Sequence, residues 1–333
     1  MTRRTVSLLV LALVFLLILW LAPSVLLVVF AGILVAVLLR GGGNWIARKL
    51  NIGPSYGLAL FCVALVLAAA VFIGFAGAAL ANQVQILIDS LPDAIEAARG
   101  YVDKHGWIQR GIDMVNPSDL APSGGATTAF NVTFGFLGNA VVILFVGLYG
   151  AVAPATYVNG FTALFSPSLR PKVRAMLKQA TIALRGWLRA QFISMTVVGV
   201  LTGLGLWALG VPLAPILAVL AALLTFIPNL GPIMAAVPAI LLGFADGLTT
   251  AMWIAGLYVV VQTVESYFIT PRVQEEVVSL PPALTISAQL LFGLLFGIMG
   301  LALATPLAAV VLRVGDKFYV DDYLEEEALQ TQA

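Results

Sequence analysis

Charged residues are scarce in this sequence, and their scarcity excludes most classes of soluble protein. Only 10% of the 333 residues are Asp, Glu, Lys or Arg, against about 25% in an ordinary soluble domain. The hydrophobic fraction is 61%, more apolar surface than a soluble core can bury, so lipid must be the solvent. The formal net charge of +1 gives no field that would attract nucleic acid. We therefore predict an all-α integral membrane protein whose first partner is the lipid bilayer, with no nucleic-acid partner.

The residues that bind metals and form disulfides are nearly absent. Cys62 is the one cysteine and lies in an apolar run, so it cannot form a disulfide within the chain and is interpreted as a packed thiol. His105 is the one histidine, and a lone histidine does not make a metal site. The sequence also has no Walker A motif, which argues against ATP-driven transport by this chain alone. We expect no metal, no cofactor and no enzymatic activity.

The first apolar run is longer than one membrane span. Val6–Leu39 would be about 50 Å long as one straight helix, against a hydrocarbon core of about 30 Å. It also exceeds the core of a signal peptide, which is about 7–15 residues. Pro23 lies in its middle, so we predict two short spans with a turn at Pro23. The basic residues of Arg40–Lys49 and the glycines Gly41–Gly43 among them predict a flexible cytoplasmic loop.

The distribution of charge predicts the orientation and the domain plan. Arg3 and Arg4 precede the first run, and the stretch 170–189 carries six basic residues and no acidic one, so both should be cytoplasmic. The segment 82–128 is acidic and amphipathic and should lie outside. We expect both termini in the cytoplasm. The predicted parts are 1–81 with the N-terminal spans, 82–129 as an extracytoplasmic amphipathic insert, 130–158 as a span, 159–191 as a basic cytoplasmic linker, 192–313 as a transport core, and 314–333 as an acidic cytoplasmic tail.

Two long apolar segments in the C-terminal half are interrupted. Residues 211–244 are broken at Pro228–Pro232, and residues 280–312 are interrupted by Gly293, Gly297, Gly300 and Pro306. Such breaks free backbone groups that lipid cannot satisfy, so they persist only when buried in protein or lining a wet cavity. Each segment is either a re-entrant hairpin or a kinked span, and we favour hairpins. They flank the uninterrupted span Leu248–Ile269, as in transporters whose sites lie where broken helices meet.

Glu265 is the sharpest candidate for function. It lies in the span Leu248–Ile269, and Gln262 is three residues earlier on nearly the same helical face. A carboxylate in hydrocarbon costs a few kcal/mol and usually faces a bundle interior or a water-filled path. Glu265 could therefore bind a proton or a cation. The structural alternative is an ion pair, for example with Arg272.

The breaks supply candidates for a solute path. Asn229 has an amide that can bind a sodium ion or a hydroxylated solute, although Pro-Asn and Gly-Pro are equally typical of a hairpin tip. The other candidates lie at or near the two interruptions: Pro228, Gly231, Pro232, Ser287, Gln289, Gly297, Gly300 and Pro306.

Three motifs in this half resemble one known family. Phe226–Pro232, Val261–Glu265 with the following Pro271, and the glycine series of Gly293–Leu307 resemble signatures of the autoinducer-2 exporter family, the PerM-like permeases. The resemblance implies a bacterial inner-membrane transporter with about eight hydrophobic segments, acting as a homo-oligomer. The activities named in that family are export of a small furanosyl signalling molecule and cation–proton exchange. The sequence departs from the family after Pro271, where Glu275–Glu276 replaces a Gly-Lys pair.

Together these features predict a secondary transporter that exports a small polar solute or signalling molecule, coupled to protons or sodium ions. Three alternatives stay open. The protein could be a channel-like passive pore formed by an oligomer, or a cation/proton antiporter. It could also be a membrane scaffold that binds partners through its polar insert.

Overall fold

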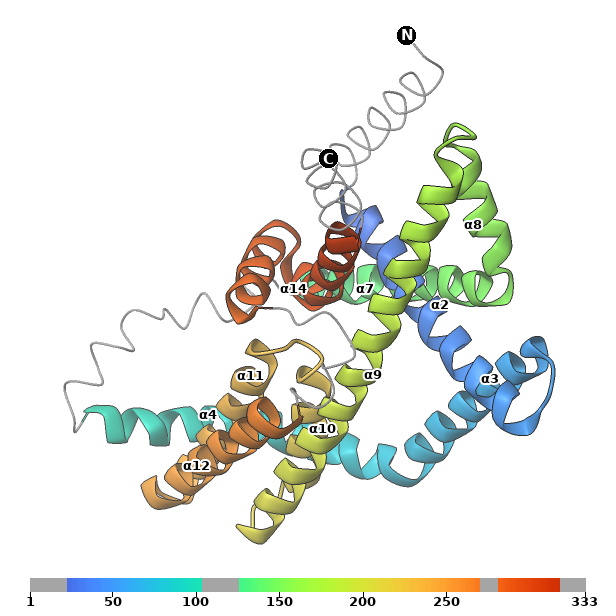
Figure 1. Cartoon of the computed structure of the whole chain (residues 1–333). Coiled ribbons are helices and arrows are strands. Elements are labelled where there is room, and N and C mark those ends of the chain that lie inside the picture. Colours follow the sequence, from blue (N-terminus) through green and yellow to red (C-terminus); the bar gives the residue numbers. More distant parts are fainter. Residues whose placement is uncertain (1–22, 104–125, 270–280, 318–333) are drawn as a thin grey trace. The chain divides into compact units, whose positions relative to one another are not determined.

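The structure is a computed structural model that describes residues 23–103, 126–269 and 281–317 (Figure 1). All of the regular structure in these ranges is helical. The chain divides into two compact units, each built from segments that are distant in the sequence. Unit 1 takes residues up to 67, 136–189 and from 274 onward, and unit 2 takes 68–135 and 190–273. The predicted all-α architecture is therefore confirmed, and each unit is described by itself below.

Unit 1 contains a tight helix pair near the N-terminus. α2 (Pro23–Leu50) begins at the proline that was expected to form a turn, and α3 (Pro54–Phe72) follows after Asn51, whose φ is 55°. Gly53–Gly57, at the start of α3, matches the pattern Gly-x-Ser-x-Gly of hydrolases. It joins two helices, whereas a nucleophile elbow joins a strand to a helix.

The prediction of a flexible loop at Gly41–Gly43 was wrong, because these glycines lie within α2. A Cβ at Gly43 would lie 2.6 Å from the Cα of Leu58, and a Cβ at Gly42 would overlap the Phe61 ring. The glycines are thus packing positions that let α3 approach the backbone of α2, the usual role of small residues between membrane helices.

α7 (Ala126–Val152) also packs closely on α2. A Cβ at Gly32 would lie 2.6 Å from the Cβ of Val146, and Gly147 meets Val35 in the same way. Arg40 donates a hydrogen bond from Nη1 to the carbonyl oxygen of Ala151 at 3.4 Å. After Val152 the chain bends by 94° into the short α8 (Pro154–Ala163). The predicted span 130–158 is therefore two helices at nearly a right angle.

α14 (Pro282–Gly315) is a helical hairpin, although its helical turns are nearly continuous. Gly297 has φ 63° and ψ −147°, a conformation that reverses the chain and that glycine adopts readily. Beyond it the two arms pack together, because Gly293 lies against Leu301 and Gly300 lies against the carbonyl of Phe292. The arms are about 22 and 27 Å long, each shorter than the hydrocarbon core of about 30 Å.

Unit 2 is built around a second helix pair, α10 (Ala214–Leu224) and α11 (Leu230–Ala245). The two helices pack on each other and are about 16 and 24 Å long, so neither arm alone crosses a bilayer. The predicted break at Pro228–Pro232 is where the chain leaves α10 and enters α11. In both interrupted segments the chain therefore folds back on itself.

α4 (Ala78–Asp103) lays its apolar face on this pair. Leu87 is buried against it, and the Gln83 side chain accepts a hydrogen bond of 3.1 Å from the backbone N–H of Ile216. That N–H lies in the first turn of α10, where it has no partner within the helix. The amphipathic helix predicted from the sequence is thus present, and the residues after it, 104–125, lie outside the described ranges.

Two more helices complete unit 2: α12 (Leu248–Val264), which continues into the π-turn η2 (Glu265–Ile269), and the second part of α9 (Arg170–Ala208). The core is apolar and includes Leu206, Leu217 and Ile254, none of them exposed. α9 is one helix of 39 residues, and the boundary predicted between residues 191 and 192 falls inside it.

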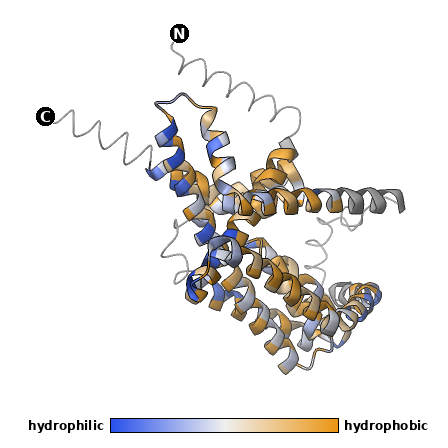
Figure 2. Ribbon diagram, turned by 90° about the vertical axis from the view of Figure 1, so that its right-hand side faces the viewer, coloured by the Kyte–Doolittle hydropathy of each residue, from blue (hydrophilic) through white to orange (hydrophobic). Residues whose placement is uncertain are grey.

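By length and composition five of the described helices are candidate membrane spans, or six if the bent pair is one span. α14 is one of the five, although it folds back at Gly297. Hydrophobic residues run along most of them in Figure 2. Val259 and Val260 of α12 are 66% and 60% exposed. Exposing these side chains to water would cost free energy, whereas contact with lipid does not. The composition and these surfaces agree that the chain is a multi-pass membrane protein.

Candidate functional site

Glu265 lies where α12 widens into the π-turn η2, and its carboxylate is half-buried. Oε1 accepts a hydrogen bond of 2.5 Å from Oγ of Ser194 on α9. Oε2 accepts from Nε2 of Gln262 at 3.2 Å and from Oγ of Ser266 at 3.3 Å. π-turns occur often at functional sites. Three donors from two helices therefore converge on one carboxylate here.

The donor from α9 belongs to a short polar stretch on an otherwise apolar face. Ser194 is buried, and so is Gln191 one turn earlier. Gln191 donates from Nε2 to the carbonyl oxygen of Thr225 at 2.5 Å. Thr225 is the first residue after α10, so this bond ties α9 to the break between α10 and α11. Through Gln191 and Ser194, α9 joins the break and the carboxylate.

Gln262 adds an acceptor beside the carboxylate. Its Nε2 also contacts Oγ of Ser266 at 3.1 Å. Its Oε1 is buried and, among the described residues, has no hydrogen-bond donor. An amide flip would turn the NH2 group away from Glu265, so the present orientation is the better one. The site therefore presents a carboxylate and a free carbonyl oxygen, the ligand types that hard cations and protons take.

The predicted residues at the first break have mainly backbone roles. Asn229 is exposed, has φ 65°, and its side chain makes no capping bond to α11. Asn tolerates this left-handed conformation better than most residues. A Cβ at Gly231 would overlap the carbonyl oxygen of Leu224, so only glycine fits there. Pro228 is half-buried and Pro232 is buried. The structure does not bring the Asn229 side chain to Glu265.

The predicted residues of the second break form a separate group in unit 1. Gln289 is fully buried and donates from Nε2 to Oγ1 of Thr305 at 3.4 Å, across the two arms of α14. Gly300 and Pro306 are buried near this bond, Gly297 is the exposed turn, and Ser287 is exposed. Arg272, the predicted partner of Glu265, lies outside the described residues.

Sequence reasoning identified Glu265 and Gln262 and missed Gln191, Ser194 and Thr225. A signal for Gln191 and Ser194 was present. They are two polar residues three apart at the start of an apolar stretch, which places them on one helical face. Their partners are 34 and 71 residues away, and no local pattern indicates such distances.

Apolar spans, two segments that fold back, and a carboxylate held among polar side chains define a class, the polytopic membrane transporters. Comparison with known families is consistent with this class. The profile described as AI-2E family transporter matches residues 9–319, so the chain belongs to the AI-2E family of transporters. The resemblance seen in the sequence motifs is thereby confirmed.

Individual relatives are similar over parts of their length. "Putative transport protein MT0215" of Mycobacterium tuberculosis is 30% identical over 67% of this chain and 64% of that protein. "Putative transport protein YrrI" of Bacillus subtilis is 28% identical over 43% of this chain and 41% of that protein. "AI-2 transport protein TqsA" of Escherichia coli K12 is 28% identical over 45% of this chain and 47% of that protein. In each case the match spans less than two thirds of the relative.

Proposed function

We propose that this protein is a secondary transporter that exports a small polar solute, and that Glu265 couples the movement to a proton or sodium gradient. The observation that supports this most directly is the set of donors around Glu265. Ser194 of α9 and Gln262 of α12 both donate to its carboxylate, so two helices are joined through one ionisable group. Binding or release of a proton or sodium ion at the Glu265 carboxylate would change its hydrogen bond to Ser194 and so the contact between α9 and α12.

The position of Glu265 in an apolar span supports a functional role. An ionised side chain at membrane depth costs about 2.5–3.5 kcal/mol on insertion scales, and such residues usually mark ion or substrate paths. The half-buried carboxylate, with the free Oε1 of Gln262 beside it, is suited to exchange one small cation for another. A group used only for packing would not need an ionisable side chain.

Flux into proteoliposomes tests the proposal. The panel of solutes begins with AI-2, which the name of the relative TqsA assigns to that protein, and continues with other small polar metabolites. Glu265→Gln keeps the size of the side chain and removes its charge. We expect the variant to lose the dependence of flux on an imposed proton or sodium gradient. Asp89→Asn on α4, an exposed carboxylate bonded to Gln85, is the matched control and should behave as wild type.

Three results would contradict the proposal. Flux that keeps its gradient dependence in Glu265→Gln would remove the coupling role. Conductance in planar bilayers that rises with solute concentration without saturating would favour a passive pore, because a carrier saturates. Gradient-dependent exchange of cations with no flux of any solute would favour a cation/proton antiporter.

We further propose an inner-membrane protein with both termini in the cytoplasm, acting as a homo-oligomer. The orientation is supported by the basic first half of α9, where residues 170–189 carry no acidic side chain. The oligomer is supported by the resemblance of the sequence motifs to the autoinducer-2 exporter family, which implies a homo-oligomer. Tags accessible at each terminus in inverted vesicles, and cross-linking in native membranes, test the two statements separately.

A further inference from the structure

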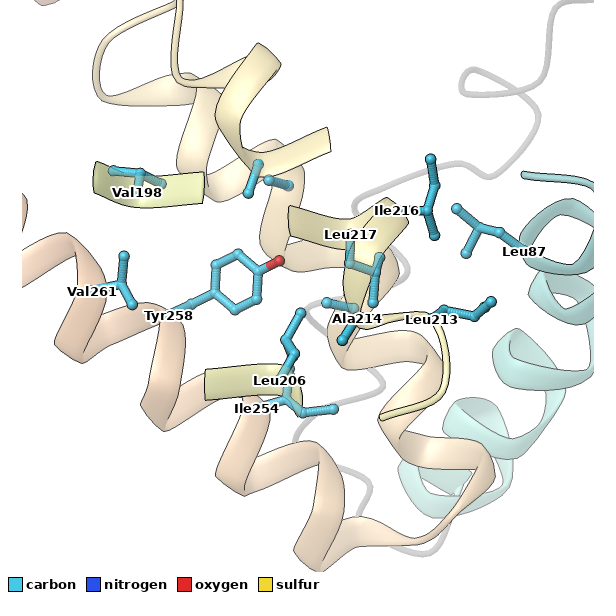
Figure 3. Packing of buried hydrophobic residues seen from close by; sticks show 13 residues of the cluster. Leu87, Val198, Leu206, Leu213, Ala214, Ile216, Leu217, Ile254, Tyr258 and Val261 are labelled. Atoms are coloured by element: carbon cyan, nitrogen blue, oxygen red, sulfur yellow. The ribbon is translucent and has the colours of Figure 1, made fainter. Parts of the chain in front are cut away.

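Two hydroxyl groups in the core of unit 2 are buried without a partner. Thr202 on α9 is 0% exposed and Tyr258 on α12 is 7% exposed. Within the described ranges, neither Oγ1 of Thr202 nor the hydroxyl of Tyr258 has a hydrogen-bond partner. Figure 3 shows the Tyr258 ring reaching from α12 into the apolar cluster, where the other side chains drawn are hydrocarbon. Buried polar groups are nearly always bonded, so each exception needs an explanation.

Thr202 differs from four other threonines that lie in or directly after described helices. Thr181, Thr196, Thr225 and Thr263 each donate to the carbonyl oxygen four residues earlier, at 2.8, 2.8, 2.6 and 2.7 Å. That local bond is the default for a threonine in an apolar helix. The Thr202 hydroxyl does not make it, so it is available to a partner beyond its own helix.

Thr202 and Tyr258 lie at the same level of two antiparallel helices. At one end Ser194 bonds to Glu265, and at the other a Cβ on Gly205 would overlap the side chain of Leu257. Between these contacts the residue numbers rise on α9 while they fall on α12. Thr202 is therefore at the level of Tyr258 and Val259, and of these two Tyr258 is the buried one. We call this contact the α9–α12 seam. We define it by the buried or half-buried residues that lie between these contacts or next to them: Ser194, Val198, Thr202 and Leu206 on α9, and Ile254, Tyr258, Val261 and Glu265 on α12.

The two hydroxyls are set back from the carboxylate along the seam. Eight residues of α9 separate Ser194 from Thr202, which is about 12 Å or two helical turns. The residues between the two polar levels, Val198 and Val261, are apolar and buried. A ligand of a few carbon atoms would span this distance only in part, so the hydroxyl pair is distinct from the Glu265 cluster.

We propose that α9 and α12 part along the seam and that Thr202 and Tyr258 then bind hydroxyl groups of a neutral, polyhydroxylated solute. The proposal rests on the transport function proposed above and adds a second site to it. In the closed seam the two hydroxyls have no partners among the described residues, which disfavours this state. A solute hydroxyl between them supplies the missing bonds. A buried site that bonds hydroxyl groups discriminates strongly against solutes without them.

Thiol labelling of the full chain in membranes tests whether the seam opens. In a Cys62→Ser background, Val198→Cys places a reporter in the seam and leaves both hydroxyls intact. Ala239→Cys on α11 is the matched control, since Ala239 is also 0% exposed and lies outside the seam. We expect a water-soluble methanethiosulfonate to label the first variant and not the second. Equal protection of both thiols would overturn the proposal.

The ligand class is tested with erythritol, a neutral four-carbon polyol, against sodium chloride at the same osmolality. We expect erythritol to slow the labelling of Val198→Cys and sodium chloride to have no effect. Adding Tyr258→Phe or Thr202→Val should raise the half-protecting erythritol concentration about three- to tenfold, as the loss of one hydrogen bond predicts. Protection by salt alone, or by neither compound, would overturn the assignment of hydroxyl ligands.

Thermal stability separates this role from a structural one. A hydroxyl that stabilises the fold would make Tyr258→Phe melt at a lower temperature, and that result would count against the proposal. We expect Tyr258→Phe to melt at or above the wild-type temperature, as Tyr267→Phe should, where Tyr267 is exposed. Neither measurement needs a known substrate or ion gradient. A flux assay that shows no coupling role for Glu265 would therefore contradict the proposed function. The hydroxyl site would still be tested separately by labelling.

Discussion

Gln289 donates a hydrogen bond to Thr305 at 3.4 Å although sixteen residues separate them in the sequence. In a straight α-helix two residues sixteen apart would be about 24 Å from each other. The chain must therefore reverse between them, and it does so at Gly297, which has a positive φ. The bond is buried between the two arms, where the Gln289 amide N–H meets the Thr305 hydroxyl oxygen away from water. It identifies the last apolar segment as a hairpin.

Cross-linking should detect this reversal. In a Cys62→Ser background, the pair Gln289→Cys and Thr305→Cys should react with dibromobimane, which becomes fluorescent when it bridges two thiols. The control pair is Thr181→Cys and Val197→Cys, also sixteen residues apart but on the continuous helix α9. Fluorescence from the α14 pair alone is the expected outcome. Equal fluorescence from both pairs, or none from the first, would mean that α14 is not folded back.

The side of the membrane that Asp246 faces distinguishes a re-entrant pair from a kinked span. If α10 and α11 enter and leave on the same side, Asp246 at the end of α11 lies outside the cell. We expect Asp246→Cys, again without Cys62, to be labelled by an impermeant maleimide added to intact cells. Ala239→Cys, which is fully buried on α11, provides the background signal. Labelling only after the inner face is opened would refute re-entrancy for this pair.

The close contact at Gly300 makes that position intolerant of any side chain. A Cβ there would overlap the carbonyl oxygen of Phe292 and lie 2.7 Å from the Cβ of Phe296. Gly300→Ala should therefore destabilise the protein by about 1–3 kcal/mol, as overpacking does, and lower its melting temperature in detergent. Gly256→Ala on α12 is the control, because nothing lies within 4 Å of its Cβ position. That variant should be slightly more stable, by up to about 1 kcal/mol, because alanine is the better helix former.

Ser194 is predicted to matter through its hydroxyl group. Its bond to Glu265 is 2.5 Å long and charge-assisted, a type worth about 1.5–3 kcal/mol. Ser194→Ala should reduce gradient-driven flux about tenfold or more, whereas Ser194→Thr keeps the hydroxyl and should retain most of it. The measurement is initial flux in proteoliposomes at matched protein content. If the two variants transport equally, the hydroxyl has no part in coupling.

The sequence predicted the class of fold and the two breaks well, because both depend on composition. Apolar runs too long for one span, interrupted at Pro228–Pro232 and at Gly297, can only bend or fold back in lipid. The sequence-based prediction was wrong at Gly41–Gly43, because these glycines were interpreted as a flexible loop and lie within α2. Glycine has two properties, freedom of the backbone and lack of a side chain, and the sequence does not say which one is in use. The neighbours Leu58 and Phe61 decide, and they come from the next helix.

The candidate site was predicted on one helix only. Gln262 and Glu265 are three residues apart, so helical geometry alone brings them together. Ser194 contributes from α9, and its role depends on the packing of two helices whose contact no local pattern encodes. Asn229 illustrates the opposite case. Its amide suggested a ligand, but its exposed side chain and its φ of 65° indicate a turn residue. A role for it in binding stays a prediction.

The π-turn that begins at Glu265 contains one residue more than an α-helical turn. Each residue of an α-helix advances the side chains by about 100° around the axis. If the wide turn moves one step toward the start of the helix, Glu265 passes from one side of it to the other, and its carboxylate swings away from Ser194. All other turns of α12 keep their hydrogen bonds during such a step. A shift of the π-turn by one residue would thus rotate one charged side chain about the helix axis, and no hinge in the chain is required.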